Sequence, residues 1–104
     1  MQVHLLDDRV ERFIQSLEYT TYGKILHAFE LLETYGYRLG MPHAKQVKKH
    51  LFELRISGQQ ETRLFYTIQT SKAIIIHGFV KKTMQTPRKE LHTALSRLRS
   101  IAEK

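Results

Sequence analysis

The sequence predicts an α+β fold in which a helical hairpin and a C-terminal helix pack on a small antiparallel sheet. Two stretches early in the chain repeat apolar residues at the spacing of a helix, and a third such stretch closes it. Between them lie three stretches typical of strands. The order strand, two helices, three strands and helix indicates an α+β sandwich. A length of 104 residues suits one small domain, which we expect to span residues 1–104.

The first part of the chain predicts a short strand and two helices. The strand is expected at residues 3–6. Apolar residues within 10–17 recur at i, i+3, i+4 and i+7, and Asp8 with Glu11 resembles a capping box, so a helix is expected to start near Asp8. A second helix carries the same spacing over residues 25–32. A tight turn joins the two, which makes a helical hairpin.

The second part predicts a three-stranded antiparallel meander and a closing helix. Residues 38–50 contain glycine and proline and show no periodicity, so we expect a basic loop there. Strands are expected at 51–57 and 62–68, where apolar and polar residues alternate, and at 73–80, where an apolar run follows a short turn. The Thr-Pro pair at 86–87 predicts the start of the last helix.

Charge is distributed unevenly along the chain, whose net charge is +7. Residues 1–37 hold three Lys or Arg against six Asp or Glu, a net of −3. Residues 38–104 hold fourteen against four, a net of +10. A polyanionic partner or an acidic protein partner would explain this asymmetry. The alternative is a charge that only keeps the protein dispersed.

The composition excludes sites that are built on cysteine. The chain has no cysteine, so we expect no disulfide framework, no thiolate zinc site and no cysteine nucleophile. Its six histidines lack metal-ligand spacing, and we expect neither a metal nor a cofactor. The N-terminus does not have the pattern of a signal peptide, and no apolar run is long enough to cross a bilayer. We therefore expect a cytoplasmic protein that does not enter a membrane.

The predicted strands bring charged side chains to one face of the sheet. Glu53 and Arg55 are two residues apart on a strand, and Arg63 lies on the next strand across a hairpin. Lys81 and Lys82 follow the third strand. The basic loop adds further cationic candidates, namely Lys45, Lys48, Lys49 and His50. The expected arrangement is one carboxylate surrounded by guanidinium and ammonium groups.

Such an arrangement suits a phosphodiester substrate. Guanidinium groups bind phosphate with two hydrogen bonds, and fixed positive charge stabilises the extra negative charge of a pentacovalent transition state. Attack by an RNA 2′-hydroxyl needs a base, for which Glu53 is the candidate, and an acid, for which Lys82 or an imidazole is the candidate. An exposed aromatic ring, Phe79 or Tyr66, is the candidate for stacking on an unpaired base.

Each of these residues also has an ordinary structural interpretation. From their spacing alone, Glu53 and Arg55 fit better on a solvated strand face whose charges resist aggregation. A lysine pair such as Lys81 and Lys82 is commonly a solubility feature, and strand aromatics such as Phe79 usually pack in a core. The residues alone therefore predict a basic α+β domain that binds RNA or an acidic protein.

Two segments taken together resemble a known family of proteins. The stretch HLFELRISGQQETRLFYTI, followed by AIIIHGFVKKTMQTP, is similar to the RelE/ParE superfamily of type II toxins, and in particular to its HigB-like, phage Gp49-like branch. The helical hairpin, basic loop, meander and closing helix follow the family's order, so the resemblance extends over nearly the whole chain. It implies a RelE-like fold.

The resemblance also implies a function and a site. It implies a ribosome-dependent mRNA endonuclease that cleaves by 2′-hydroxyl attack without metal. Arg55 and Arg63 match the family's arginines that bind and polarise the scissile phosphate, Lys82 matches a basic position after the last strand, and Glu53 occupies a position of proton transfer. The cations of the basic loop, with Lys81 and Phe79, are expected to contact ribosomal or messenger RNA. Family members often carry a C-terminal tyrosine in the catalytic set, and this chain has none after Tyr66, which leaves the general acid unassigned.

The partners implied by the resemblance are the ribosome, mRNA and a cognate antitoxin. The antitoxin is expected to be a small helix-turn-helix protein that forms a heteromeric complex with the toxin. Two alternatives stay open. One is a ParE-like toxin that is not a nuclease and binds a protein target such as DNA gyrase. The other is a catalytically inert RNA-binding remnant.

Overall fold

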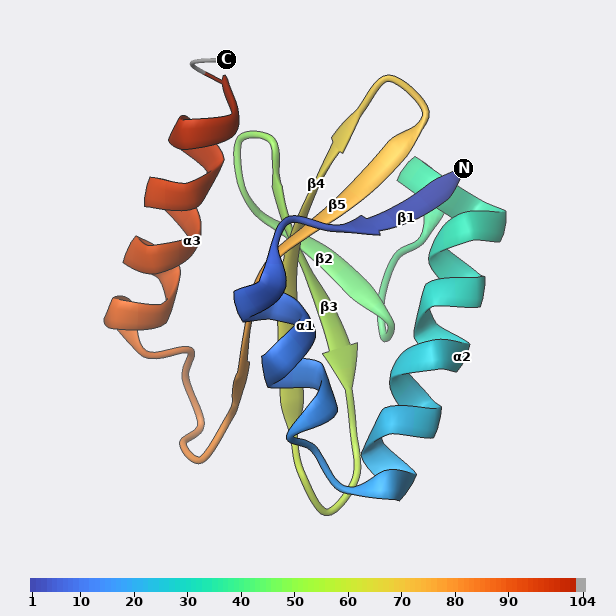
Figure 1. Cartoon of the computed structure of the whole chain (residues 1–104), viewed down its shortest axis with the longest axis vertical. Helices are drawn as coiled ribbons and strands as arrows, with labels where there is room; N and C mark the ends of the chain where they lie inside the picture. Colours follow the sequence, from blue (N-terminus) through green and yellow to red (C-terminus); the bar gives the residue numbers. More distant parts are fainter. Residues whose placement is uncertain (103–104) are drawn as a thin grey trace.

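The computed structural model of the protein describes residues 1–102, so the last two residues of the domain expected at 1–104 lie outside the described residues. Helices and strands are segregated along the chain in an α+β arrangement, with two α-helices before four consecutive strands and a further α-helix at the end (Figure 1). The elements are, in order, β1 (Gln2–Leu5), α1 (Asp8–Gln15), α2 (Tyr19–Tyr35), the 3₁₀ helix η1 (Gly36–Arg38), β2 (Ala44–Lys48), β3 (Leu51–Ile56), β4 (Thr62–Gln69), β5 (Lys72–Val80) and α3 (Arg88–Ala102). The α+β class predicted from the sequence is confirmed.

The sheet has five strands rather than the expected meander with one added strand. Its order is β1-β5-β4-β3-β2, with β1 parallel to β5 and all other neighbours antiparallel. The meander β3-β4-β5 and the N-terminal strand are present within it. The sheet is therefore mixed, and the prediction of its exact composition is corrected by the fifth strand.

The fifth strand, β2, forms within the segment that was predicted to be a basic loop. Ala44 pairs with Leu54 and Lys45 pairs with Glu53, and the register shifts between Gln46 and Lys48. Backbone groups of a segment beside an open sheet edge gain partners by pairing with it, whatever the side-chain pattern. This long-range pairing outweighs the local sequence pattern, which predicted a loop.

The helical hairpin forms as predicted, but its first cap lies one residue earlier. The carboxylate of Asp7 accepts from the backbone N–H of Arg9 at 3.0 Å and of Val10 at 3.4 Å. Asp7 is thus the N-cap of α1, in place of the expected capping box of Asp8 and Glu11. The next helix, α2, begins after the short connection 16–18 and packs on the same face of the sheet.

Helices α1 and α2 lie on one side of the sheet and helix α3 on the other (Figure 1). An apolar cluster fills the space on each side. Helices α1 and α2 cover one face, where alternate residues of β3 and β4 such as Leu54 and Leu64 are buried. Helix α3 covers the other face, where Phe65, Ile76 and Ala94 are buried. The alternation predicted for β3 and β4 is confirmed. Within residues 1–102, no helix has the length and apolarity needed to cross a membrane.

Candidate functional site

The register of the strands places two rows of polar and aromatic side chains on the face beneath α3. One row runs from Lys45 on β2 through Glu53 on β3 and Phe65 on β4 to β5. The neighbouring row pairs Arg55 with Arg63 across β3 and β4. The predicted grouping of one carboxylate with two arginines is therefore present in the fold.

Glu53 is the most deeply buried carboxylate of the site. Its residue is only 2% exposed, and its Oε1 lies 3.6 Å from Arg63 Nε and 3.9 Å from Arg55 Nη1. A buried charge is tolerated only where opposite charge or hydrogen bonds compensate the loss of water. The two arginines supply that compensation. The alternative interpretation of Glu53 as a solvated strand residue does not fit its burial.

The two arginines differ in their access to solvent. The Arg63 side chain is 4% exposed, whereas that of Arg55 is 26% exposed. Arg63 Nη1 donates to the Thr62 carbonyl at 3.0 Å and to Glu61 Oε2 at 3.2 Å, while its buried Nε has no hydrogen-bond partner. Arg63 thus lies beneath Glu53 and bridges it to Glu61. Arg55 is the guanidinium that a molecule in solvent reaches more readily.

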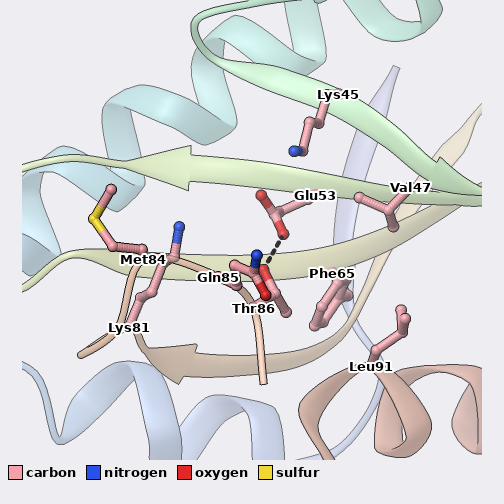
Figure 2. Close-up of a pocket in the computed structure, with 9 residues that line it drawn as sticks. All are labelled: Lys45, Val47, Glu53, Phe65, Lys81, Met84, Gln85, Thr86 and Leu91. Carbon is pink, nitrogen blue, oxygen red and sulfur yellow. Dashed lines mark hydrogen bonds between the residues drawn. The ribbon is translucent and has the colours of Figure 1, made fainter. Parts of the chain in front are cut away.

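A residue that sequence reasoning did not assign to the site also binds Glu53. The Thr86 hydroxyl donates to Glu53 Oε2 at 3.2 Å across 33 positions of sequence (Figure 2). Thr86 lies in the 81–87 connection between β5 and α3, and the first helical residue is Arg88. The last helix was predicted to start at the Thr-Pro pair 86–87, and it starts directly after that pair. The Thr86 side chain also binds the Glu53 carboxylate. No local sequence signal marks this contact.

A cavity of about 330 Å³ opens beside Glu53, between the sheet and the 81–87 connection (Figure 2). Polar and apolar side chains both line it. They are Lys45, Val47, Glu53, Phe65, Lys81, Met84, Gln85, Thr86 and Leu91. Figure 2 shows Lys45 on the β2 side of Glu53 and Lys81 on the β5 side. The cavity, called the Glu53 pocket below, therefore combines one carboxylate, two ammonium groups and an apolar wall.

The two neighbouring lysines at the end of β5 lie in different places. Lys81 is half-buried and lines the Glu53 pocket, and its backbone N–H donates to the Glu61 carbonyl at 2.6 Å. Lys82 is exposed and is not among the lining residues. Because side chains alternate between faces along a strand, Lys81 follows Phe79 toward the α3 side. That period of two is the signal that distinguishes the lysines.

The other predicted RNA-contact residues are spread over the surface and the core. Lys48, Lys49 and His50 are exposed around the turn between β2 and β3. His50 lines a second cavity with residues of α3, away from Glu53. Phe79 is buried, with its ring centroid 5.9 Å from that of Phe65, so it is a core residue rather than an exposed stacking ring. The other stacking candidate, Tyr66, is likewise buried, in the cluster on the α1–α2 side.

A second polar cluster anchors α3 to the sheet. His77 Nε2 lies 2.9 Å from Glu90 Oε1, and Arg97 Nη1 lies 2.9 Å from the Ile76 carbonyl and 3.3 Å from His77 Nδ1. Because Arg97 donates to Nδ1, Nε2–H donates to Glu90. Burial lowers the pKa of His77, with Glu90 opposing that effect and Arg97 adding to it. Both ring nitrogens are engaged in holding α3. Across residues 1–102, no three His, Asp or Glu side chains are grouped as a metal site would need.

Comparison with known families gives one match. The model of the family described as phage derived protein Gp49-like (DUF891) matches residues 12–99, well over half of the chain. The matched range runs from within α1 to within α3 and includes every residue that lines the Glu53 pocket. A search of curated proteins finds no match.

Proposed function

Because this chain belongs to the family of phage-derived Gp49-like proteins, we propose that it is the toxin of a toxin–antitoxin pair. Family membership is consistent with such a toxin. The more specific proposal is a RelE- or HigB-like, ribosome-dependent mRNA endonuclease. The observation that carries it is the buried Glu53 carboxylate, held between two arginines and open to a pocket with two lysines.

In the proposed reaction, Glu53 takes the proton of an RNA 2′-hydroxyl. The 2′-oxygen then attacks the adjacent phosphorus, the bond from phosphorus to the 5′-oxygen breaks, and a water molecule supplies the proton that the leaving 5′-oxygen takes up. The products are a 2′,3′-cyclic phosphate and a 5′-hydroxyl, and the proposal requires no metal. The phosphate gains negative charge in the transition state, and preorganised positive groups stabilise that charge. Arg55, Lys45 and Lys81 are the cations placed to do so.

Arg55 has a double role in this proposal. In the free protein its guanidinium lies 3.9 Å from Glu53, a long contact for an ion pair. A phosphate that accepts hydrogen bonds from Arg55 competes with the carboxylate for this cation. Substrate binding therefore weakens one of the two charge contacts that hold Glu53 and leaves the carboxylate freer to accept a proton.

Arg63 and Thr86 are proposed to position Glu53 rather than to touch RNA. Arg63 is buried beneath the carboxylate, and the Thr86 hydroxyl binds the oxygen that Arg63 does not approach. With Oε1 beside the arginines and Oε2 bound by Thr86, the carboxylate has one orientation. Holding a catalytic group in a productive geometry lowers the entropic cost of the reaction. This departs from the resemblance, which implies that Arg63 binds the phosphate itself.

The exposed cations of the chain are proposed to dock it on ribosomal RNA. They include Lys48 and Lys49, next to His50 in the turn between β2 and β3, and Lys82 after β5. Binding that rests on phosphate contacts releases counterions and weakens steeply as salt is added. We propose a cytoplasmic site of action and inhibition by a small helix-turn-helix antitoxin in a heteromeric complex. Ribosome binding that does not respond to salt would contradict the docking role.

The test is to map mRNA 5′ ends on translating ribosomes in cells that express the chain. Glu53→Gln keeps the size of the side chain and removes its basicity, so we expect cuts within the A-site codon to disappear. Glu18→Gln, an exposed change just before α2, is the matched control and should cut like the unaltered chain. Growth arrest without cuts would contradict the nuclease and favour a protein target such as DNA gyrase. Absence of arrest would leave an RNA-binding domain.

A further inference from the structure

The outer side of α2 carries an exposed stripe that neither core uses. Among residues 1–102, six of the seven exposed large apolar side chains lie between positions 19 and 41. Three of the six follow one line along α2: Tyr19 at 90% exposure, Tyr22 at 37% and Leu26 at 46%. Their i, i+3, i+7 spacing places them on one face of the helix. The sequence pattern predicted Leu26 in the buried stripe, and its exposure corrects that prediction.

The same face becomes acidic toward the C-terminal end of α2. Glu30 and Glu33 are exposed, and at 3.6 residues per turn they fall with the three apolar residues within an arc of roughly 80°. We call these five residues, 19, 22, 26, 30 and 33, the α2 stripe. It contains no Lys or Arg. Two positive groups of this region are engaged elsewhere, since Lys24 Nζ donates to the Ser57 carbonyl at 2.8 Å and the N-terminal ammonium to the Glu33 carbonyl at 3.1 Å.

The charge of the α2 stripe excludes one class of partner and favours another. The chain has a net charge of +7, yet residues 1–37 have a net of −3. Glu30 and Glu33 form no ion pair with any residue of the described range 1–102, and two such carboxylates repel the phosphates of a nucleic acid and attract a cationic surface. Exposed tyrosine and leucine side chains are typical anchors of protein interfaces. The complementary partner is therefore a protein segment that is both basic and apolar.

We propose that the α2 stripe is a docking surface for a basic amphipathic helix of a partner protein. A helix laid along α2 presents apolar side chains at i, i+3, i+4 and i+7, which match the spacing of Tyr19, Tyr22 and Leu26. Lysine or arginine side chains one or two turns further along the partner reach Glu30 and Glu33. The two tyrosines add contact area with few rotatable bonds to immobilise.

A partner held in this way leaves the Glu53 pocket uncovered. Helix α2 packs on one face of the sheet and helix α3 on the other (Figure 1). The pocket opens on the α3 face, where Glu53, Phe65 and Leu91 line it. This docking surface does not depend on the proposed nuclease, because it follows from the exposure and charge of α2 alone. The proposed contact on α2 also differs from one in which an acidic partner protein covers the exposed lysines of residues 38–102.

The test uses a synthetic helical peptide with leucine along one side and lysine along the other. Titrated into the full chain, it should shift backbone amide resonances of residues 19–33 and leave those around Lys45 and Lys81 unchanged. The charge reversal E30K/E33K should weaken peptide binding at least about tenfold, because two attractive contacts become repulsive. D8K/E11K makes the same change of net charge on exposed positions of α1, outside the stripe, and should have little effect.

Three results would overturn the proposal. The first is equal weakening by the two charge reversals, which would mean that only net charge matters. The second is equal binding of a peptide in which glutamate replaces every lysine. The third is self-association of the chain, detected by sedimentation and removed by Y22S/L26S, since the occupant would then be a second copy. Y22S/L26S alters only exposed side chains, so it should keep the fold and abolish peptide binding.

Discussion

The two faces of the sheet are covered in different ways. On the α1–α2 side, thirteen buried hydrophobic residues form one cluster, and the buried polar residues there, Thr21 and Thr62, are uncharged. On the α3 side the buried cluster has five members, and charged or polar groups, Glu53 and Arg63 among them, are buried beside it. A buried ion pair contributes little net stability compared with apolar packing of the same volume. The first face therefore supplies most of the apolar packing, and the second face carries the proposed site.

Helix α2 repeats this contrast on a smaller scale. Its inner side buries Ile25 and Leu32 completely, while its outer side exposes the α2 stripe. Packing in the core accounts for the apolar character of the inner residues, but it does not account for the exposed apolar residues on the outer side. Each prediction below separates residues that hold the molecule together from residues that are free to act on a partner or substrate.

The largest effect is expected from the inner side of α2. Leu32→Ala should lower the free energy of unfolding by about 3 kcal/mol, because it leaves a cavity in the larger core. Tyr22→Ser, on the outer side, should change it by less than about 0.5 kcal/mol. Urea denaturation followed by circular dichroism measures both. Similar losses in the two variants would mean that the outer side of α2 also supports the fold.

The next effect distinguishes the two lysines after β5. Lys81→Ala should slow cleavage of ribosome-bound mRNA by about 10²-fold, since it removes a cation from the Glu53 pocket. Lys82→Ala changes an exposed side chain and should slow single-turnover cleavage only a few-fold at saturating ribosomes. A larger loss in Lys82→Ala than in Lys81→Ala would contradict the placement of the substrate in the pocket.

A smaller effect is expected from the hydroxyl that holds Glu53. Thr86→Val should lower kcat by about tenfold with KM unchanged, because the lost hydrogen bond to a carboxylate orients the base and does not bind substrate. Thr86→Ser should restore the rate. Thr83→Val is the control in the same connection, since its hydroxyl donates to the Gln85 carbonyl instead. A change in KM alone, or a serine variant that does not restore the rate, would contradict a positioning role for Thr86.

The smallest effect concerns pH and the anchor of α3. Burial lowers the pKa of His77 in the folded state, so the unfolded chain binds a proton more readily. The free energy of unfolding should therefore fall, by about 1 kcal/mol or less, as pH decreases from about 7.5 to about 5.5. His77→Gln should remove this slope, since glutamine does not titrate. A rise in stability over the same interval would contradict the assigned direction.

Local sequence patterns predicted the face on which each charged residue lies. The period of two in β3 and β4 puts Glu53, Arg55 and Arg63 on one side, and the register confirms it. This prediction succeeds because side-chain direction along a strand depends on the nearest neighbours. Lys81 and Lys82 were both expected at the site, and the structure places only Lys81 in the Glu53 pocket.

Contacts between distant segments were not predictable in this way. The β2 strand exists because residues 44–48 pair with β3, and the Thr86 hydroxyl meets Glu53 across 33 positions. Phe79 had both a core and a stacking interpretation from the sequence. The choice between them, like the exposure of Leu26, depends on which helix covers which part of the sheet. In each case the contact that decides the outcome is made with another helix or strand. The sequence around the residue itself therefore does not predict it.

The central claim is that the Glu53 pocket cleaves RNA through the 2′-hydroxyl, and a substrate change tests it most directly. Ribosomes are programmed with mRNA that carries either ribose or 2′-deoxyribose throughout the A-site codon, and the products of the purified chain are analysed. We predict cleavage of the ribose form alone, with a 2′,3′-cyclic phosphate and a 5′-hydroxyl at the new ends. Cleavage of the deoxyribose form, or a 5′-phosphate at the cut, would contradict the account.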